Sequence, residues 1–303
     1  MSTVPDIVSG YIEDLTIIRQ TRISQLVWCT MLFYDHLITF DQEVEYIWNA
    51  GWSIPTILFF ALRYVGDGLA ILSIIAFLSD PSQQVFSDGF IFFAAWSESV
   101  LIWIMQIILQ MRIYALYKRS RRVLVFMTAT FVMEIIAMST IMILADTDID
   151  IVNSLPPDVQ ICAADGLPNF FFGWWLPIII FEGLLCMFAL CAGVRQLILR
   201  SQLEGFRGGR AVDSLVKGNV FYFLCVLIPC TLNTVVWATL GVSYVQITQG
   251  FGFATAIVVG CRVVLSLRRT LSRKTETSTE LISLATIPFQ ETWIVPHMPQ
   301  SPL

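Results

Sequence analysis

Hydrophobic residues in this chain gather into seven long stretches, and polar residues collect in the segments between them. A helix needs about 20 mostly apolar residues to cross the hydrocarbon core of a bilayer. The stretches cover residues 23–40, 55–78, 89–111, 123–145, 170–194, 219–240 and 246–266. This pattern predicts an all-α, polytopic integral membrane protein with seven transmembrane helices.

The first stretch is the weakest of the seven. Arg22 stands at its start, and Asp35 and His36 interrupt it. If this stretch did not cross the bilayer, six helices would remain and the N-terminus would change sides.

The distribution of Lys and Arg predicts the orientation, because short loops rich in these residues stay on the cytoplasmic side. The loop at 146–169 contains five aspartates and no Lys or Arg, so it is expected outside. Basic residues follow the third, fifth and seventh stretches: Arg112, Lys118, Arg119, Arg121 and Arg122; Arg195, Arg200, Arg207, Arg210 and Lys217; Arg268, Arg269, Arg273 and Lys274. The N-terminus is therefore predicted outside and the C-terminus inside.

The loop at 41–54 lacks the basic residues expected on the cytoplasmic side. It carries Asp41, Glu43 and Glu45 instead, although acidic residues count little in this rule. Trp48 and Trp52 suit the headgroup region, where amphipathic rings collect. We expect a short interfacial helix here.

Three regions follow from this pattern. Residues 1–22 form an N-terminal segment, which lacks the basic start of a cleaved signal peptide, and residues 23–268 form the seven-helix membrane domain. Residues 269–303 combine Ser, Thr and charged side chains with four prolines after residue 287. This composition predicts a disordered cytoplasmic tail.

Composition supports the membrane environment and excludes several function classes. Hydrophobic residues make up 56% of the chain and charged residues 14%, outside the ordinary range of soluble globular proteins. The net charge of −5 gives no reason to expect nucleic-acid binding. Six of the seven cysteines lie inside apolar stretches, and Cys162 lies in a polar loop. No known catalytic motif is visible, so we predict no enzyme activity, no metal site and no cofactor.

Three carboxyl groups are predicted deep in the membrane. Glu98, Glu134 and Glu182 each lie roughly 15 Å from the start of a predicted helix, given a rise of about 1.5 Å per residue. An ionisable group at the bilayer centre costs about 2.5 to 3.5 kcal/mol on insertion scales, so each needs a physical reason. One hypothesis is a proton- or cation-sensing site or a polar ligand pocket. The other is interhelical hydrogen bonding that only stabilises the bundle.

A second polar group is predicted toward the cytoplasmic side. Arg63 and Asp67 are four residues apart in the second stretch, which allows an ion pair on one helix face. Asp35 of the first stretch lies at a similar depth and could join them, and neighbouring His36 could respond to pH. The group is either a charged lock whose opening accompanies a conformational change or a neutralised structural pair. Asn233 in the sixth stretch, close to Pro229, marks a further polar position and a plausible kink.

Several segments together resemble a known group of proteins. The run from Tyr34 to Trp48, YDHLITFDQEVEYIW, followed by Trp52 and Arg63-Tyr64, is similar to an N-terminal domain of unknown function. That domain marks seven-helix membrane proteins of mushroom-forming fungi, and here the likeness spans residues 23–65. It continues in MRIYALYKRSRRVL (111–124), WLPIIIFE (175–182), VFYFLCVLIPCTLNTVVW (220–237) and CRVVLSLR (261–268). The resemblance implies an uncharacterised fungal membrane protein and transfers no catalytic or ligand residue.

Three functions remain open from the sequence. Seven helices, basic cytoplasmic loops and a Ser/Thr-bearing tail favour a receptor-like sensor of unknown ligand, with a cytoplasmic signalling partner. The deep carboxyls favour an ion- or proton-coupled transporter or channel, and a membrane scaffold or partner subunit is the third hypothesis. The expected location is the plasma membrane or another endomembrane, with the lipid bilayer as the main partner.

Overall fold

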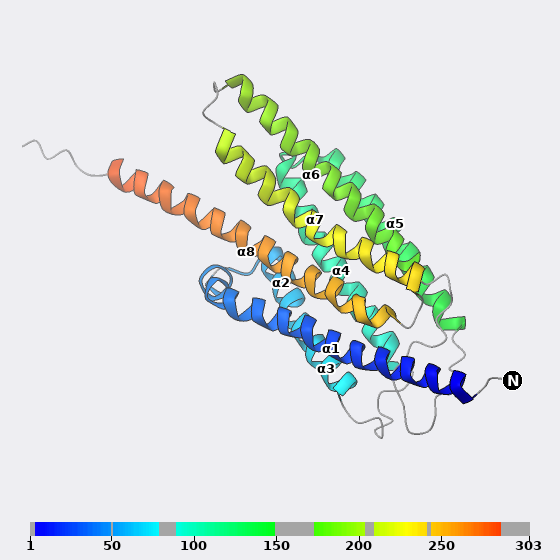
Figure 1. The fold of residues 1–303 in the computed structure, drawn as a ribbon. Helices are drawn as coiled ribbons and strands as arrows, with labels where there is room; N and C mark the ends of the chain where they lie inside the picture. The colour runs from blue at the N-terminus through cyan, green and yellow to red at the C-terminus, as the bar shows by residue number, and fades with distance from the viewer. Residues whose placement is uncertain are drawn as a thin grey trace, which may run out of the picture.

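The computed structural model describes residues 4–49, 51–78, 89–148, 173–203, 209–240 and 244–285. Within these ranges the chain forms a bundle of long helices (Figure 1). Its elements are α1 (Val4–Glu43), the π-helix η1 (Val44–Trp48), α2 (Ile54–Phe60), the π-helix η2 (Ala61–Val65), α3 (Gly66–Leu78), α4 (Gly89–Leu116), α5 (Arg121–Asp148), α6 (Trp175–Leu203), α7 (Gly209–Leu240) and α8 (Val245–Ala285). The predicted all-α class holds throughout the described residues.

Six segments of the described chain are long and apolar enough to cross a membrane. They are Ile54–Ala76, Phe93–Leu116, Arg121–Ala145, Trp175–Arg195, Phe221–Leu240 and Ile247–Thr270. Each overlaps one of the last six predicted stretches, so the chain is an integral, multi-pass membrane protein. The first predicted stretch, residues 23–40, lies in α1 and is not one of these six.

Two helices extend further than the sequence pattern indicates. Helix α1 begins at Val4, so most of the predicted N-terminal segment is helical. Helix α8 continues to Ala285, so residues 269–285 are helical where a disordered tail was expected. Extending an existing helix avoids the cost of nucleation, and this segment contains neither Gly nor Pro. The rest of the tail and the loop with Cys162 lie outside the described residues.

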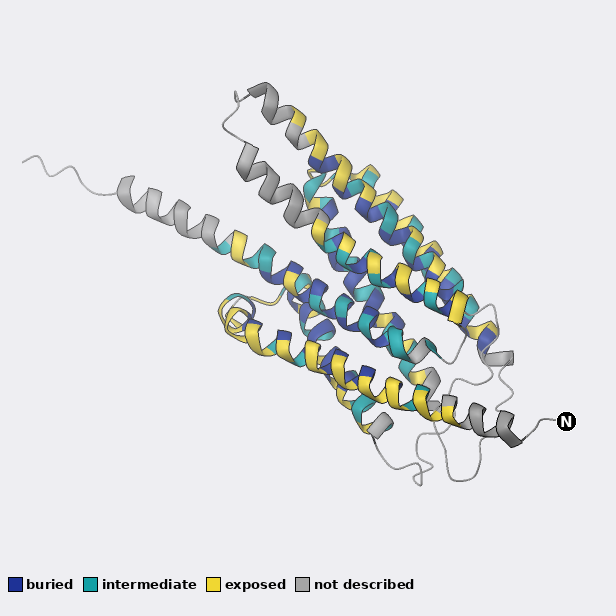
Figure 2. Cartoon of the chain, in the orientation of Figure 1, coloured by how far each residue is buried: buried dark blue, intermediate teal, exposed yellow. Residues whose placement is uncertain are grey.

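Helix α8 forms the centre of the bundle, in contact with α1, α2, η2, α4 and α7. Three of its glycines lie directly against neighbouring side chains. A Cβ atom at Gly250 would lie 2.1 Å from Trp28 Nε1, one at Gly252 2.7 Å from Asn233 Nδ2, and one at Gly260 2.3 Å from Leu62 Cδ2. Small residues of this kind let membrane helices pack closely. The middle of α8 is accordingly mostly buried (Figure 2).

Helix α1 buries several polar side chains and exposes many of its large apolar ones. Its buried face includes polar residues at helical spacing: Thr21, Ser24, Gln25, Asp35, Thr39 and Glu43. Its outer face exposes large hydrophobic residues: Ile23, Leu26, Val27, Met31, Tyr34, Leu37, Ile38 and Phe40. An amphipathic helix of a soluble protein has the opposite arrangement. The outer face of α1 therefore suits a lipid environment (Figure 2).

Two π-helical segments interrupt this part of the chain, one directly after α1 and one directly after α2. The η1 turn continues α1, where the sequence predicted a short interfacial helix, and it ends at the half-exposed Trp48. The η2 turn lies between α2 and α3 and carries Arg63 and Tyr64. Single π-turns are rare and are frequently found at functional sites. Both therefore direct attention to this part of the molecule.

Candidate functional site

Charged side chains from α1, η2, α3 and α8 meet near the C-terminal end of α1. We call this group the charged cluster. It consists of Asp35, His36, Thr39, Glu43, Arg63, Tyr64, Asp67 and Arg262.

Arg63 lies at the centre of the charged cluster and is fully buried. Its Nη1 is 3.0 Å from Asp35 Oδ2, and its Nη2 donates a hydrogen bond to Thr39 Oγ1 at 2.5 Å. Its Nε lies 3.8 Å from Glu43 Oε2, an ion-pair distance beyond hydrogen-bond range. The guanidinium group thus connects η2 with three positions of α1.

Glu43 is also fully buried, and it accepts one hydrogen bond from η1 and one from η2. The Tyr64 hydroxyl donates to Oε1 at 2.6 Å, and the Trp48 Nε1 donates to the same oxygen at 3.0 Å. These bonds join α1 to η1 and η2. Hydrogen bonds to a charged group are the stronger kind, so Glu43 is held firmly in place.

Helix α8 and α3 complete the charged cluster. Arg262 of α8 places its Nε and Nη2 each 2.7 Å from Asp35 Oδ1, so Asp35 bridges two guanidinium groups. His36 Nδ1 lies 2.5 Å from Asp67 Oδ2 of α3, and its Nε2 lies 3.7 Å from Glu43 Oε2. Three carboxylates therefore face two guanidinium groups and one imidazole.

A second tie joins α8 to this region just beyond the charged cluster. The Nη2 of Arg268 donates hydrogen bonds to Ser53 and Thr56, and the Thr56 bond measures 2.6 Å. Both hydroxyls stand at the start of α2, so Arg268 fixes α8 to that point.

In place of an ion pair between Arg63 and Asp67, each of the two residues pairs with residues of α1. Arg63 pairs with Asp35 and Glu43, and Asp67 pairs with His36. The charge of Arg63 still acts on Asp67, although the direct contacts of the guanidinium group are with α1. Asp35, which the sequence analysis allowed to join the pair, lies against Arg63, and its neighbour His36 lies against Asp67.

The sequence analysis missed Thr39 and Glu43 as members of the site. A signal was present, because Asp35, Thr39 and Glu43 are spaced four residues apart and so share one helix face. The prediction that α1 would end near residue 40 placed Glu43 in a loop and concealed this face.

The first 46 residues of the membrane domain match a known family model. Residues 23–68 match a family of unknown function, DUF6533. No protein with a curated description and no solved structure matches the chain. The predicted domain of unknown function is thereby confirmed.

The DUF6533 segment contains almost the whole charged cluster. Of its eight residues only Arg262, on α8, lies outside residues 23–68. Both π-helical segments also fall within the matched range. The charged cluster is therefore the main polar feature that the DUF6533 segment builds.

A second polar region lies between α4, α5 and α6. Glu134 of α5 accepts a hydrogen bond from Gln106 Nε2 of α4 at 2.7 Å. Glu182 of α6 is fully buried beside Gln106 and within electrostatic range of Glu134. Among the described residues, neither Glu182 oxygen makes a hydrogen bond of ideal geometry, but the Gln106 amide is close enough to act on it as a donor. We call Glu134 and Glu182 the deep carboxyl pair.

The third predicted carboxyl lies elsewhere. Glu98 of α4 accepts a hydrogen bond from Gln249 of α8. Asn233 of α7 is buried against Gly252 of α8, and its Oδ1 lacks a hydrogen-bond partner within the described part of the chain. The structure therefore brings together two of the three predicted carboxyls and leaves Glu98 and Asn233 in separate contacts.

The two polar regions differ in what they can do. The charged cluster balances opposite charges across several helices, so it can hold those helices together and release them if one charge changes. The deep carboxyl pair has oxygens available for a donor, so it can accept and return a proton.

Proposed function

We propose that the chain is a seven-helix, receptor-like membrane sensor in which the charged cluster controls the cytoplasmic ends of α1, α3 and α8. The observation that carries the proposal is the buried Arg63, which shares its charge between Asp35 and Glu43 of another helix. Breaking one such contact leaves a buried charge without compensation, which is costly enough to shift a conformational equilibrium.

The exposed apolar face of α1 supports the proposal that α1 is the seventh transmembrane helix. Its exposed face is apolar through the predicted stretch at 23–40, and its charged groups face the bundle and are paired. Paired interior charges are the form in which ionisable residues occur in membrane helices. The hydropathy of this stretch is reduced by Asp35 and His36, whose contacts lie inside the protein.

The proposed orientation places the N-terminus outside, on the basis of the Lys and Arg distribution. The charged cluster then lies on the same side of the bundle as the basic residues that end α4 and α6 and those in the last part of α8, where a cytoplasmic signalling partner would bind. We also infer a fungal source, on the motif in residues 34–48.

Distance measurements between spin labels on α1 and α8 test the proposed control function. The labels are placed at Gln42 and Arg269, both exposed, after replacement of the seven native cysteines. We expect one distance population in the parent protein and a second, longer one in Asp35→Asn, because the substitution removes the charge that Arg63 and Arg262 share.

The matched control is Asp41→Asn, which makes the same chemical change at an exposed position of α1. It should leave a single population. A single unchanged population in Asp35→Asn, with the protein still folded, would contradict control by the charged cluster and leave it a structural feature.

A proton-coupled transporter is the second candidate, favoured by the deep carboxyl pair. Glu134 accepts one hydrogen bond, from Gln106, and the pair lies between three helices that could move relative to one another. Proton flux into liposomes containing the purified protein tests this function. The double variant Glu134→Gln with Glu182→Gln should abolish the flux, whereas Glu98→Gln should retain it because Glu98 binds Gln249 instead. No flux in the parent protein would exclude the transporter.

A further inference from the structure

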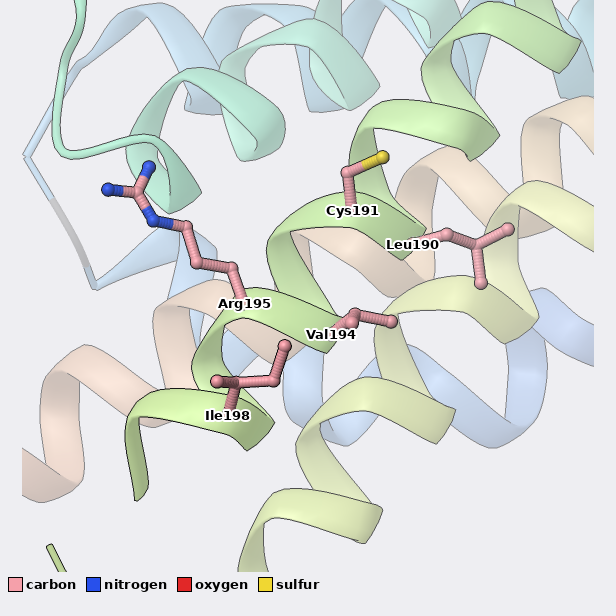
Figure 3. Close-up of a pocket in the computed structure, with 5 residues that line it drawn as sticks. All are labelled: Leu190, Cys191, Val194, Arg195 and Ile198. Carbon is pink, nitrogen blue, oxygen red and sulfur yellow. The ribbon is translucent and has the colours of Figure 1, made fainter. Parts of the chain in front are cut away.

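A hollow of about 440 Å³ lies on the outside of α6 and is open to the surroundings of the bundle. Its described lining consists of Leu190, Cys191, Val194, Arg195 and Ile198 (Figure 3). Spacings of four residues place them in one stripe along the helix. We call this stripe the α6 groove. Four of its five side chains are apolar or weakly polar, and one is a cation.

The α6 groove crosses the boundary between the hydrocarbon core and the headgroup region. The apolar segment of α6 runs from Trp175 to Arg195, so Leu190 and Val194 lie inside it and Arg195 ends it. Leu190 and Val194 are both about half exposed, although they are apolar. The groove therefore offers an apolar wall followed directly by a positive charge.

The side chain of Arg195 is directed toward the turn between α4 and α5 (Figure 3). Its charge acts on Tyr117 at that turn, opposing the effect of burial, which raises the pKa of the Tyr117 hydroxyl. The Tyr117 hydroxyl donates a hydrogen bond to the Phe188 carbonyl of α6 at 3.0 Å, which fixes the turn beside α6.

The same turn presents further basic residues. It ends α4 with two bonds of a Schellman motif, from Arg119 N to Tyr114 O and from Lys118 N to Ala115 O. Lys118 and Arg119 both have positive φ angles, 53° and 60°. Both side chains are exposed, and Arg121 and Arg122 follow at the start of α5. The turn that Tyr117 fixes beside α6 therefore adds exposed positive charge on the side to which Arg195 is directed.

We propose that the α6 groove binds one anionic phospholipid. The acyl chain lies along Leu190 and Val194, and the headgroup, through its net negative charge, pairs with Arg195 at the end of the apolar segment. An apolar wall that leads to a cation matches the two parts of such a lipid. In the proposed orientation this is the cytoplasmic leaflet, which carries the anionic lipids. The inference depends on the membrane location and is independent of the proposed sensor function.

Native mass spectrometry of the full chain in detergent tests the proposal. The probes are dioleoylphosphatidylserine and dioleoylphosphatidylcholine, titrated separately. We expect tighter binding of phosphatidylserine to the parent protein. Arg195→Gln should weaken phosphatidylserine binding roughly fivefold, since one basic residue contributes about 1 kcal/mol at a membrane surface. Arg195→Lys should keep most of it.

Two further variants separate the groove from general charge. Val194→Trp should weaken the binding of both lipids, because the larger ring fills the apolar wall. Arg269→Gln, an exposed arginine on α8, should change neither. Equal binding of the two lipids to the parent protein would overturn the proposal, as would equal losses in Arg195→Gln and Arg269→Gln. A dimer that Val194→Trp disrupts would assign the groove to a second copy of the chain and also overturn it.

Discussion

The charged cluster and the deep carboxyl pair both bury acidic groups, but only the charged cluster pairs them with basic side chains. In the charged cluster, Asp35 and Glu43 each lie within ion-pair distance of a basic side chain. In the deep carboxyl pair, both glutamates lie beside the same neutral amide, Gln106, and neither has a basic partner among the described residues. The stability of the charged cluster therefore depends on each of its charges, whereas the packing around the deep carboxyl pair does not require a charge. Removing a single charge should therefore lower the free energy of unfolding more in the charged cluster than in the deep carboxyl pair.

The largest effect is expected from Arg63→Met. This change leaves Glu43 buried without its guanidinium partner and Asp35 with Arg262 alone, at a cost of about 3 to 5 kcal/mol in the free energy of unfolding. Unfolding of the purified protein in mixed detergent micelles measures this cost. The control Arg269→Met removes an exposed arginine and should stay within about 0.5 kcal/mol. Similar free energies of unfolding for the two variants would show that the ion pairs of Arg63 do not stabilise the protein.

The same neutralisation in the two regions should give different results. Glu43→Gln weakens the charge-assisted bonds from Tyr64 and Trp48 and should cost about 1.5 to 3 kcal/mol. Glu182→Gln removes a carboxyl without a hydrogen bond in the described structure and should cost about 1 kcal/mol or less. The same unfolding assay compares them, with the exposed Glu45→Gln as the reference. A larger loss at Glu182 than at Glu43 would reverse the comparison.

Packing between α1 and α8 should contribute separately from charge. A methyl group at Gly250 would overlap the Trp28 ring, so Gly250→Ala should cost about 1 to 3 kcal/mol. Gly183→Ala on α6 meets open space and should be neutral or slightly stabilising. Thermal unfolding in detergent measures both. Equal behaviour of the two alanines would mean that α1 is not held closely against α8.

Hydropathy was enough to predict six of the helices, because crossing a bilayer imposes a length and composition that a sequence displays directly. The extension of α8 to Ala285 was missed, because composition favours disorder where the chain is polar and says nothing of a helix already begun. The turns η1 and η2 were missed as well, because no residue type specifies a π-turn.

The polar contacts were harder to predict than the helices. Arg63, Asp35 and Asp67 were singled out as costly groups in an apolar segment, a signal that depends only on chemistry. Their partners depend on which helices become neighbours. Arg262 lies 227 residues from Asp35 and joins it only because α8 packs against α1. Glu98 and Glu134 were predicted at similar depths, but depth alone does not say which face of the bundle a residue occupies.

A double-mutant cycle between Arg63 and Asp35 tests the central claim most directly. The free energies of unfolding are measured for the parent protein, Arg63→Met, Asp35→Leu and the double variant. If the charged cluster holds the helices through this pair, the double variant should lose about 2 kcal/mol less than the sum of the single losses. Additivity within about 0.5 kcal/mol would show that the two residues act independently and would contradict the account.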